Sequence, residues 1–427
     1  MTMDPSNRTK SGNQCEIRLL VFAGEFSTTL DDRWLLDDIV DELAAQGAIV
    51  DVIVFDNNRP RPRGVSVRNG GRVRVISVGP ERRPRRFALK AWNYLCSAWL
   101  MHTKVYRLVG RARYDLALFT SVGIMTAGVP ARLKANGKVE KLLFVLWDFF
   151  PVHQVEIGRL PGTSWVESLR HAEYLSFARA DVVAVMTPAN SSFLAAYHPR
   201  YQGRVILLPP WAQSFPEDES KGRQTTVFTA VFGGQLVAGR GVETLLHAAR
   251  LLDLRGLRIR IVIAGEGPLR EGLESMARSL GLSNVTFLGA LPRPEYRELL
   301  KTAHVGIAAT VAGVSVPSFP SKIVEYCRAS LPVVACLEEA TDAGKILLQS
   351  GAGTSVPAND EEALAAALEN MEAQHRSGEL HVMSKAARSL FDSTLSATHA
   401  ARTILAECSE NPTSPRATVV EYEHRDR

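Results

Sequence analysis

The feature that most constrains the fold is the alternation of short apolar runs with amphipathic helical patterns. An apolar run at residues 17–23 precedes a polar loop, a helical pattern between Leu35 and Leu43, and a second apolar run at residues 49–55. A strand, a helix and a strand at this spacing are typical of a doubly wound parallel sheet. We therefore expect an α/β fold whose ligands bind beyond the carboxyl ends of the strands.

The same alternation restarts after residues 209–223, which are rich in proline, serine and charge, as linkers are. Further strands are expected at residues 74–78, 116–120, 142–147, 182–186, 205–209, 227–233, 259–264, 285–288, 304–309, 331–335 and 353–356. Further helices are expected at residues 242–252, 269–280, 361–371 and 384–407. The chain therefore divides into two halves of the same type.

The length of 427 residues also favours two domains, because single domains usually hold roughly 100 to 200 residues. We place the first domain at residues 15–209 and the second at residues 210–388. A helix at about residues 389–408 is expected to pack back on the first domain. Residues 409–427 have the composition of a disordered tail.

Charge is divided unevenly between the halves. Residues 1–210 contain 28 lysines and arginines against 19 acidic residues, a net charge of +9, and the remainder carries −4. Such asymmetry indicates an anionic partner for the first half. No recognised nucleic-acid-binding motif accompanies the basic residues, so an anionic membrane surface fits better than nucleic acid.

Residues 81–113 hold nine basic residues and one acid, interleaved with aromatic residues such as Trp92, Trp99 and Tyr106. As a helix, this segment would be a basic amphipathic surface with aromatic anchors, as interfacial helices have. A core helix with a solvated basic edge is the alternative. The chain starts with polar residues and has no run of eighteen uncharged apolar residues, so we expect a cytoplasmic protein without spanning helices.

Three segments of the second half have residues suited to phosphate and ribose. The first, VFGGQLVAGRG, runs from a strand through a glycine-rich turn, with Gly234 and Gln235, to Arg240 at a helix start. Backbone N–H groups at a helix start attract phosphate, and an arginine adds bidentate contacts. An ordinary strand-to-helix turn with a solvated arginine is the alternative.

The second segment, IVIAGEGPL, contains Gly265, Glu266, Gly267 and Pro268. It is not a dinucleotide fingerprint, because that motif requires glycine where Arg270 stands and an acidic residue at the end of the next strand. We interpret the segment as a turn beside a nucleotide base.

The third segment, VPSFPSKIVEYCRASLPVV, brings a proline-rich loop to a helix that begins near Ser321. Lys322 and Glu325 are three residues apart and therefore share one face of this helix, near its N-terminus. The cation can bind phosphate there while the carboxylate takes the hydroxyl pair of a ribose. A local lysine–glutamate pair on a capped helix is the alternative.

In order and spacing these three segments resemble the donor half of family 4 glycosyltransferases, which have the GT-B fold of two facing Rossmann-like domains with parallel sheets. The turn G-R-L-x-x-x-K-G of that family places Gln235 at its arginine and Arg240 at its lysine. Its E-x7-E signature places Glu325 at the second glutamate and Pro317 at the first. The form P-S-K-I-x-E-Y followed by L-P-V-V resembles the subgroup that acts in bacterial exopolysaccharide, O-antigen and colanic-acid assembly.

The first half carries a matching signal. The segment LFVLWDFFPVHQVEIGRL resembles the D-x-x-P-x-x-x-x-x-L-G segment of the same subgroup, with Trp147 where many relatives have a histidine that faces the reacting sugar. Asp148 and His153 are therefore the candidate catalytic residues. A structural role for a histidine or an aspartate near a strand end is the alternative.

The resemblance implies a retaining glycosyltransferase of the hexosyltransferase type, in which residues 15–209 bind the acceptor and residues 210–388 bind a nucleoside-diphosphate sugar. The expected donor-binding residues are Gly234, Gln235, Arg240, Gly265, Glu266, Gly267, Pro268, Ser321, Lys322 and Glu325. No D-x-D pair occurs, which favours a metal-independent route in which Arg240, Lys322 and a helix N-terminus stabilise the leaving diphosphate. We expect no bound metal and no cofactor.

A lipid-linked acceptor, such as a polyprenyl-diphosphate sugar, would explain why the acceptor half is basic. The enzyme would then be a peripheral protein on the inner face of the plasma membrane. A polar glycan acceptor would need no such surface. Two other functions stay open at this point: a nucleotide-sugar epimerase of the same fold, and a non-catalytic glycosyltransferase-like subunit that binds a partner enzyme.

Overall fold

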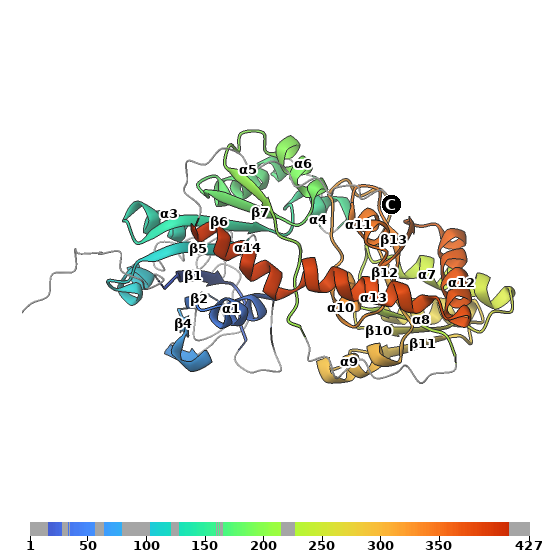
Figure 1. Cartoon of the computed structure of the whole chain (residues 1–427). Coiled ribbons are helices and arrows are strands. Elements are labelled where there is room, and N and C mark those ends of the chain that lie inside the picture. The colour runs from blue at the N-terminus through green and yellow to red at the C-terminus, as the bar shows by residue number, and fades with distance from the viewer. Residues whose placement is uncertain are drawn as a thin grey trace, which may run out of the picture.

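The computed structural model describes residues 16–27, 33, 35–55, 64–78, 103–120, 128–158, 160, 162, 165–214 and 227–409. These residues form two α/β halves that lie side by side, each built on its own sheet (Figure 1). The expected fold of two Rossmann-like halves is therefore confirmed. Most of residues 81–113, most of the linker and nearly all of the tail lie outside the described residues. The predictions of an interfacial helix, a linker and a disordered tail therefore stay predictions for those residues.

The first sheet has the strand order β3-β4-β2-β1-β5-β6-β7-β8, and its strands pair in parallel except for β3 with β4. The strands are β1 (Arg18–Ala23), β2 (Ile49–Val54), β3 (Gly64–Arg68), β4 (Val73–Ser77), β5 (Tyr114–Thr120), β6 (Val139–Leu146), β7 (Val182–Val185) and β8 (Arg204–Leu207). The helices with them are α1 (Leu35–Ala45), α3 (Gly128–Ala135), α4 (Val152–Glu156), α5 (Val166–Phe177) and α6 (Pro188–Tyr197).

Side chains of the central strands alternate between two apolar layers. On β1, Leu19 and Val21 pack into the cluster that covers one face of the sheet, and Leu20 and Phe22 pack into the cluster on the other face. A doubly wound sheet buries both faces in this way, which is why its strands read as continuous apolar runs. Polar side chains are therefore left to the helix surfaces and the strand ends.

The second sheet has the strand order β11-β10-β9-β12-β13-β14, and all of these pairs are parallel. The strands are β9 (Thr229–Gly233), β10 (Arg260–Ala264), β11 (Val285–Gly289), β12 (Val305–Ala309), β13 (Val333–Leu337) and β14 (Gly353–Pro357). The helices are α7 (Val242–Leu254), α8 (Arg270–Ser279), α9 (Arg293–Thr302), α10 (Ser321–Arg328), α11 (Ala343–Ser350) and α12 (Glu361–Ser377).

The continuous helix expected at residues 384–407 is wrong, because the chain turns in the middle of this range. Helix α13 (Leu380–Leu390) runs through a π-helical turn, η5 (Phe391–Leu395), and α14 (Ala397–Ser409) begins after it. Ser396 between them is extended and pairs with Ala212, whose carbonyl oxygen accepts the N–H of Ala397 at 2.8 Å. These backbone groups bond to the connection between the halves, so the helix cannot continue. Helix α14 then packs against α1 of the first half (Figure 1).

The edge strand β3 was missing from the expected strands. Its side chains Val65 and Val67 are 55% and 61% exposed, and none of its residues is buried. A strand without a buried face lacks the apolar pattern by which strands are recognised in a sequence.

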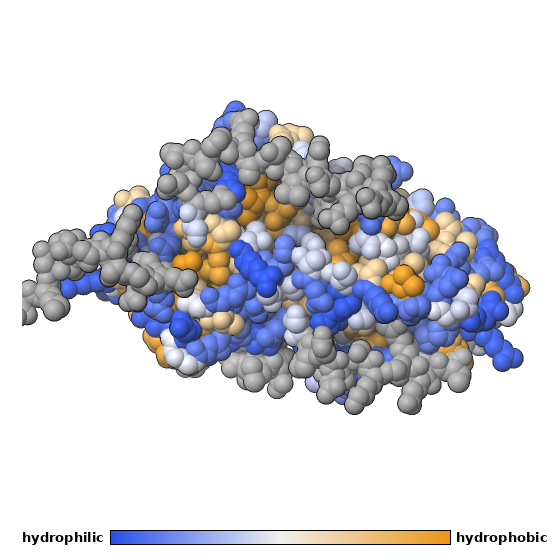
Figure 2. Space-filling view, viewed as in Figure 1, coloured by the Kyte–Doolittle hydropathy of each residue, from blue (hydrophilic) through white to orange (hydrophobic). Residues whose placement is uncertain are grey.

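None of the helices in the described part of the chain is both long and apolar enough to cross a bilayer. On the face seen in Figure 2, hydrophilic residues surround several small apolar areas.

Candidate functional site

The glycine-rich turn after β9 lies at the carboxyl edge of the second sheet and leads into α7. Gly241 precedes this helix with φ +60°, and a Cβ atom there would lie 2.5 Å from the carbonyl oxygen of Thr310. Only glycine combines this backbone conformation with so close an approach. The N-terminus of α7, with Arg240 directly before it, is thereby held against the end of β12.

The turn after β10 is joined to the glycine-rich turn by backbone contacts. A Cβ atom on Gly265 would lie 1.8 Å from the carbonyl oxygen of Gly234, and one on Gly267 would lie 2.2 Å from that of Leu236. The N–H of Leu236 donates to the carbonyl oxygen of Glu266 at 2.9 Å. These glycines are therefore needed for the packing of one turn on the other, independently of any ligand.

Two further donor candidates, Glu266 and Pro268, belong to the same turn after β10. The carboxylate of Glu266 forms an ion pair with Arg270, one helical turn further on, and both side chains border Gly289 at the end of β11. Pro268 lies two residues before the start of α8. An exposed ion pair of this kind contributes little stability.

Lys322 stands at the start of α10 with its ammonium group buried. Its Nζ atom lies 3.6 Å from the centre of the Phe232 ring and 3.6 Å from where a Cβ atom of Gly234 would be. Within the described part of the chain this Nζ has no hydrogen-bond partner. Burial, and secondly the charge of Arg240, lower the pKa of Lys322 well below its usual value. The charge of Arg240 thus acts on the buried ammonium, which has no acidic partner among the described residues.

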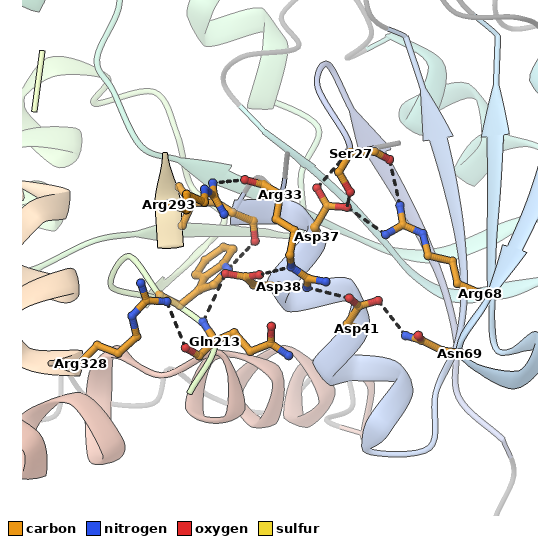
Figure 3. A network of polar contacts seen from close by, with 12 residues as sticks. Ser27, Arg33, Asp37, Asp38, Asp41, Arg68, Asn69, Gln213, Arg293 and Arg328 are labelled. Atoms are coloured by element: carbon orange, nitrogen blue, oxygen red, sulfur yellow. Dashed lines mark hydrogen bonds and ion pairs between the residues drawn. The ribbon is translucent and has the colours of Figure 1, made fainter. Parts of the chain in front are cut away.

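Glu325 does not pair with Lys322, so the local lysine–glutamate alternative is excluded. Its carboxylate forms an ion pair with Arg328 on the same helix. Arg328 also donates to the carbonyl oxygen of Gln213 at 3.3 Å, and the N–H of Gln213 donates to Asp38 of α1 at 3.3 Å. Glu325 is therefore connected through its partner to the polar network that joins the two halves in Figure 3.

Two tyrosines support the site, and neither was recognised in the sequence. The hydroxyl of Tyr326 accepts the N–H of Gly233 at 2.9 Å and donates to the carbonyl oxygen of Ile307 at 3.1 Å. A Cβ atom on Gly233 would overlap the hydroxyl of Tyr296. Burial raises the pKa of both phenols, so both stay neutral. The tyrosine after Glu325 in the motif was the only signal that could have indicated this role.

The remaining donor candidates, Gln235 and Ser321, are both exposed. Gln235 follows Gly234 in the glycine-rich turn, and Ser321 is the first residue of α10. Ser321 directly precedes Lys322, and Gln235 lies five residues before Arg240. Among the described residues no cluster of three or more histidine, cysteine, aspartate or glutamate side chains could hold a metal ion.

Asp148 and His153 lie in the first half, after the end of β6. Asp148 is exposed, and His153 lies on α4 with a buried Nδ1 atom that has no hydrogen-bond partner in the described chain. No hydrogen bond or ion pair in the described part links either residue to Arg240, Lys322 or Glu325. The charge of Arg240 acts on Lys322, whereas within the described residues Asp148 and His153 make no polar contact with either cation.

The turn that carries Asp148 is held by a buried acid–base pair. Glu173 of α5 accepts the N–H of Phe150 at 2.6 Å, and its other carboxylate oxygen lies 2.9 Å from Nε2 of His198. Burial raises the pKa of Glu173, while the contact with His198 opposes this shift. Trp147, before this turn, packs against Trp211 at 5.9 Å between ring centres, and its indole N–H is buried without a partner among the described residues.

Comparison with known families matches both halves. The model of the glycosyl transferases group 1 matches residues 214–390, and that of the glycosyl transferase 4-like domain matches residues 35–211. An uncharacterized glycosyltransferase of Methanocaldococcus jannaschii is 26% identical over 314 residues, which cover 69% of this chain and 74% of that protein. The O-antigen chain mannosyltransferase C of Escherichia coli is 29% identical over 196 residues, 42% of this chain and 49% of its own length.

Solved structures with the same fold cover nearly the whole chain. Sucrose-phosphate synthase from Thermosynechococcus elongatus has a TM-score of 0.69 at 16% identity, over 92% of this chain and 98% of its own. The Anabaena protein HepE, solved in complex with UDP and glucose, has a TM-score of 0.61 at 16% identity, over 93% of this chain and 100% of its own. At these identities the likeness establishes the fold.

Proposed function

Because the chain belongs to the family 4 glycosyltransferases of GT-B fold, we propose that it moves a sugar from a nucleoside-diphosphate sugar to an acceptor in bacterial surface polysaccharide synthesis. The second half binds the donor and the first half binds the acceptor. The O-antigen relative and the UDP complex of HepE support a polysaccharide precursor and a nucleotide-linked donor.

The buried ammonium of Lys322 beside Arg240 is the observation that carries the proposal. Two cations stand at the starts of two helices, and one of them is desolvated and has no acidic partner among the described residues, so a diphosphate would complete the site. As the bond to the sugar breaks, negative charge grows on this diphosphate. Fixed cations and helix N-termini stabilise that charge without reorganisation.

The other donor residues surround this centre. Gly234 offers its backbone and Gln235 and Ser321 their polar side chains to the diphosphate, while the turn with Gly265, Glu266, Gly267 and Pro268 borders the base. Glu325 takes the ribose hydroxyl pair, because a carboxylate bound to Arg328 keeps free lone pairs.

Transfer proceeds with retention of the anomeric configuration and without a metal or cofactor. The sequence has no D-x-D pair, and Arg240 with Lys322 provides the positive charge that a metal would otherwise supply. Asp148 and His153 are the proposed catalytic residues of the first half, which follow a strand end at the edge where ligands bind in such sheets.

The acceptor is lipid-linked, such as a polyprenyl-diphosphate sugar, and the enzyme lies on the inner face of the plasma membrane. The net charge of +9 in the first half supports this. In the described part of the basic segment, Lys104, Arg107, Arg111 and Arg113 are exposed, and so are Tyr106 and Leu108. Cations with exposed apolar side chains suit an anionic bilayer surface.

Titration of the protein with a panel of nucleoside diphosphates tests the donor site. Arg240→Ala combined with Lys322→Ala is expected to weaken binding at least about a hundredfold, because each lost charged contact is worth about 1.5–3 kcal/mol. Calorimetry measures this change. The matched control is Arg258→Ala with Lys345→Ala, which removes two exposed cations of the same half and should leave the affinity unchanged. Equal affinity of both double variants would remove the donor-site assignment.

A further inference from the structure

The loop between β12 and α10 reaches from the second half into the core of the first. Val316 is 2% exposed and belongs to the same apolar cluster as Phe149 and Leu194 of the first half. Val314 packs against that cluster as well. Residues 314–317, which we call the peg, are therefore inserted between the elements of the first half.

The carboxylate of Glu156, the last residue of α4, holds the peg. It accepts the N–H of Ser315 at 2.9 Å, the N–H of Val316 at 3.3 Å and the hydroxyl of Ser315. An ionised acceptor makes stronger hydrogen bonds than a neutral one. One side chain of the first half thus satisfies three donors of the second.

Neighbouring contacts continue along the same boundary. The fully buried Asn190 of α6 donates from Nδ2 to the carbonyl oxygen of Pro317 at 2.8 Å, and the N–H of Ala189 donates to Asp342 at 2.9 Å. Ile157, directly after Glu156, lies 3.6 Å from where a Cβ atom of Gly239 would be. The end of α4 therefore touches both the peg and the glycine-rich turn.

Within the second half, Glu338 binds residues on both sides of the peg in the loop between β12 and α10. Glu338, which is 4% exposed, accepts the hydroxyl of Ser318 at 2.6 Å and that of Thr310. The loop that contains the peg is thus bound by two carboxylates. Glu338 of its own half binds Thr310 and Ser318 outside the peg, and Glu156 of the other half binds the peg itself. Four residues after the peg, the chain enters α10 and reaches Lys322.

We infer that Glu156 is a positioning residue. By accepting hydrogen bonds from the peg, it keeps the two halves closed on the donor. The peg is followed by α10, and the end of α4 touches the glycine-rich turn. The hydrogen bonds of Glu156 therefore hold Lys322 and this turn in the arrangement that receives the diphosphate. Glu156 touches no reacting atom in this role. The inference rests on the proposed function, since it concerns closure around the same donor.

Hydrogen exchange and steady-state kinetics on Glu156→Ala test the inference. The amides of Ser315 and Val316 lose their acceptor, so their exchange is expected to become about tenfold faster. The KM for the sugar nucleotide is expected to rise about tenfold with a smaller change in kcat, because saturating donor restores the closed form. Glu156→Gln keeps an acceptor oxygen for the two N–H groups and is expected to restore most of both values.

The control is Gln154→Ala on the same helix, whose side chain makes no hydrogen bond in the described structure. It should leave exchange and KM at wild-type values, and thermal unfolding verifies that every variant is folded. Unchanged exchange in Glu156→Ala, or faster exchange with an unchanged KM, would overturn the inference. In either case the wild type still binds donor, whereas failure of the proposed function would appear as no binding by the wild type.

Discussion

At the scale of single residues, Lys322 is the central residue of the proposed donor site. Its position after a proline-rich loop and at a helix start led to its prediction as a phosphate-binding cation. Its burial over Phe232 was not predictable, because it depends on packing between segments distant in the chain. The supporting hydroxyl of Tyr326 escaped prediction for the same reason. Glu325 instead pairs locally with Arg328, three residues further along the same helix.

Replacement of Lys322 by methionine is expected to stabilise the ligand-free protein by about 1–3 kcal/mol at pH 7, since a buried, unpaired charge is exchanged for an apolar chain of similar length. The pKa of Lys322 is lowered in the folded chain, so the unfolded chain binds the proton more tightly. Wild-type stability therefore rises with pH between the folded and the unfolded pKa values of Lys322, and the stability advantage of Lys322→Met narrows over that range.

Urea unfolding at several pH values measures this difference. Lys345→Met, at an exposed position of α11, is the control and should change stability by less than about 0.5 kcal/mol. If Lys322→Met were less stable than the wild type across the whole pH range, the ammonium would not be a destabilising group.

At the scale of elements, apolar periodicity was sufficient to predict most strands and helices. It failed where the local structure depends on pairing with another segment of the chain. The turn between α13 and α14 depends on a backbone pairing of Ser396 with Ala212, which no local pattern records. The strand β3 forms by pairing with β4 while its valines stay exposed, so it lacks the pattern that identifies a half-buried strand.

A short helix at residues 103–109, which precedes β5 and carries the exposed Lys104 and Arg107, is the element on which the membrane proposal can be tested. Lys104→Glu with Arg107→Glu is expected to weaken flotation with anionic phosphatidylglycerol vesicles at low salt at least about tenfold, because each cation near such a surface contributes about 1 kcal/mol. Vesicles of neutral phosphatidylcholine should not bind the wild type.

Arg258→Glu with Arg278→Glu reverses the same number of exposed charges in the donor half and is expected to float as the wild type does. Failure of the wild type to float with anionic vesicles would remove the lipid-linked acceptor from the account, and the donor site would be unaffected.

At the scale of the whole molecule, two similar halves meet through a few specific contacts. The repeated strand–helix alternation predicted both sheets, because burial on both faces leaves a strong apolar signal. The way the halves meet was not predictable, because the contacts join surfaces that have no common local pattern. These contacts are the network around Gln213 (Figure 3) and the hydrogen bonds of Glu156 with Ser315.

The most direct test of the account is a transfer assay on the purified protein with a panel of nucleotide sugars and a polyprenyl-diphosphate sugar acceptor, in the presence of EDTA. We predict that one donor is consumed with release of its nucleoside diphosphate, that NMR of the product shows the donor's anomeric configuration, and that Arg240→Ala with Lys322→Ala abolishes the reaction. Binding of a donor without any turnover would contradict the account and indicate a non-catalytic subunit. Conversion of the donor to its epimer would also contradict it and indicate a nucleotide-sugar epimerase.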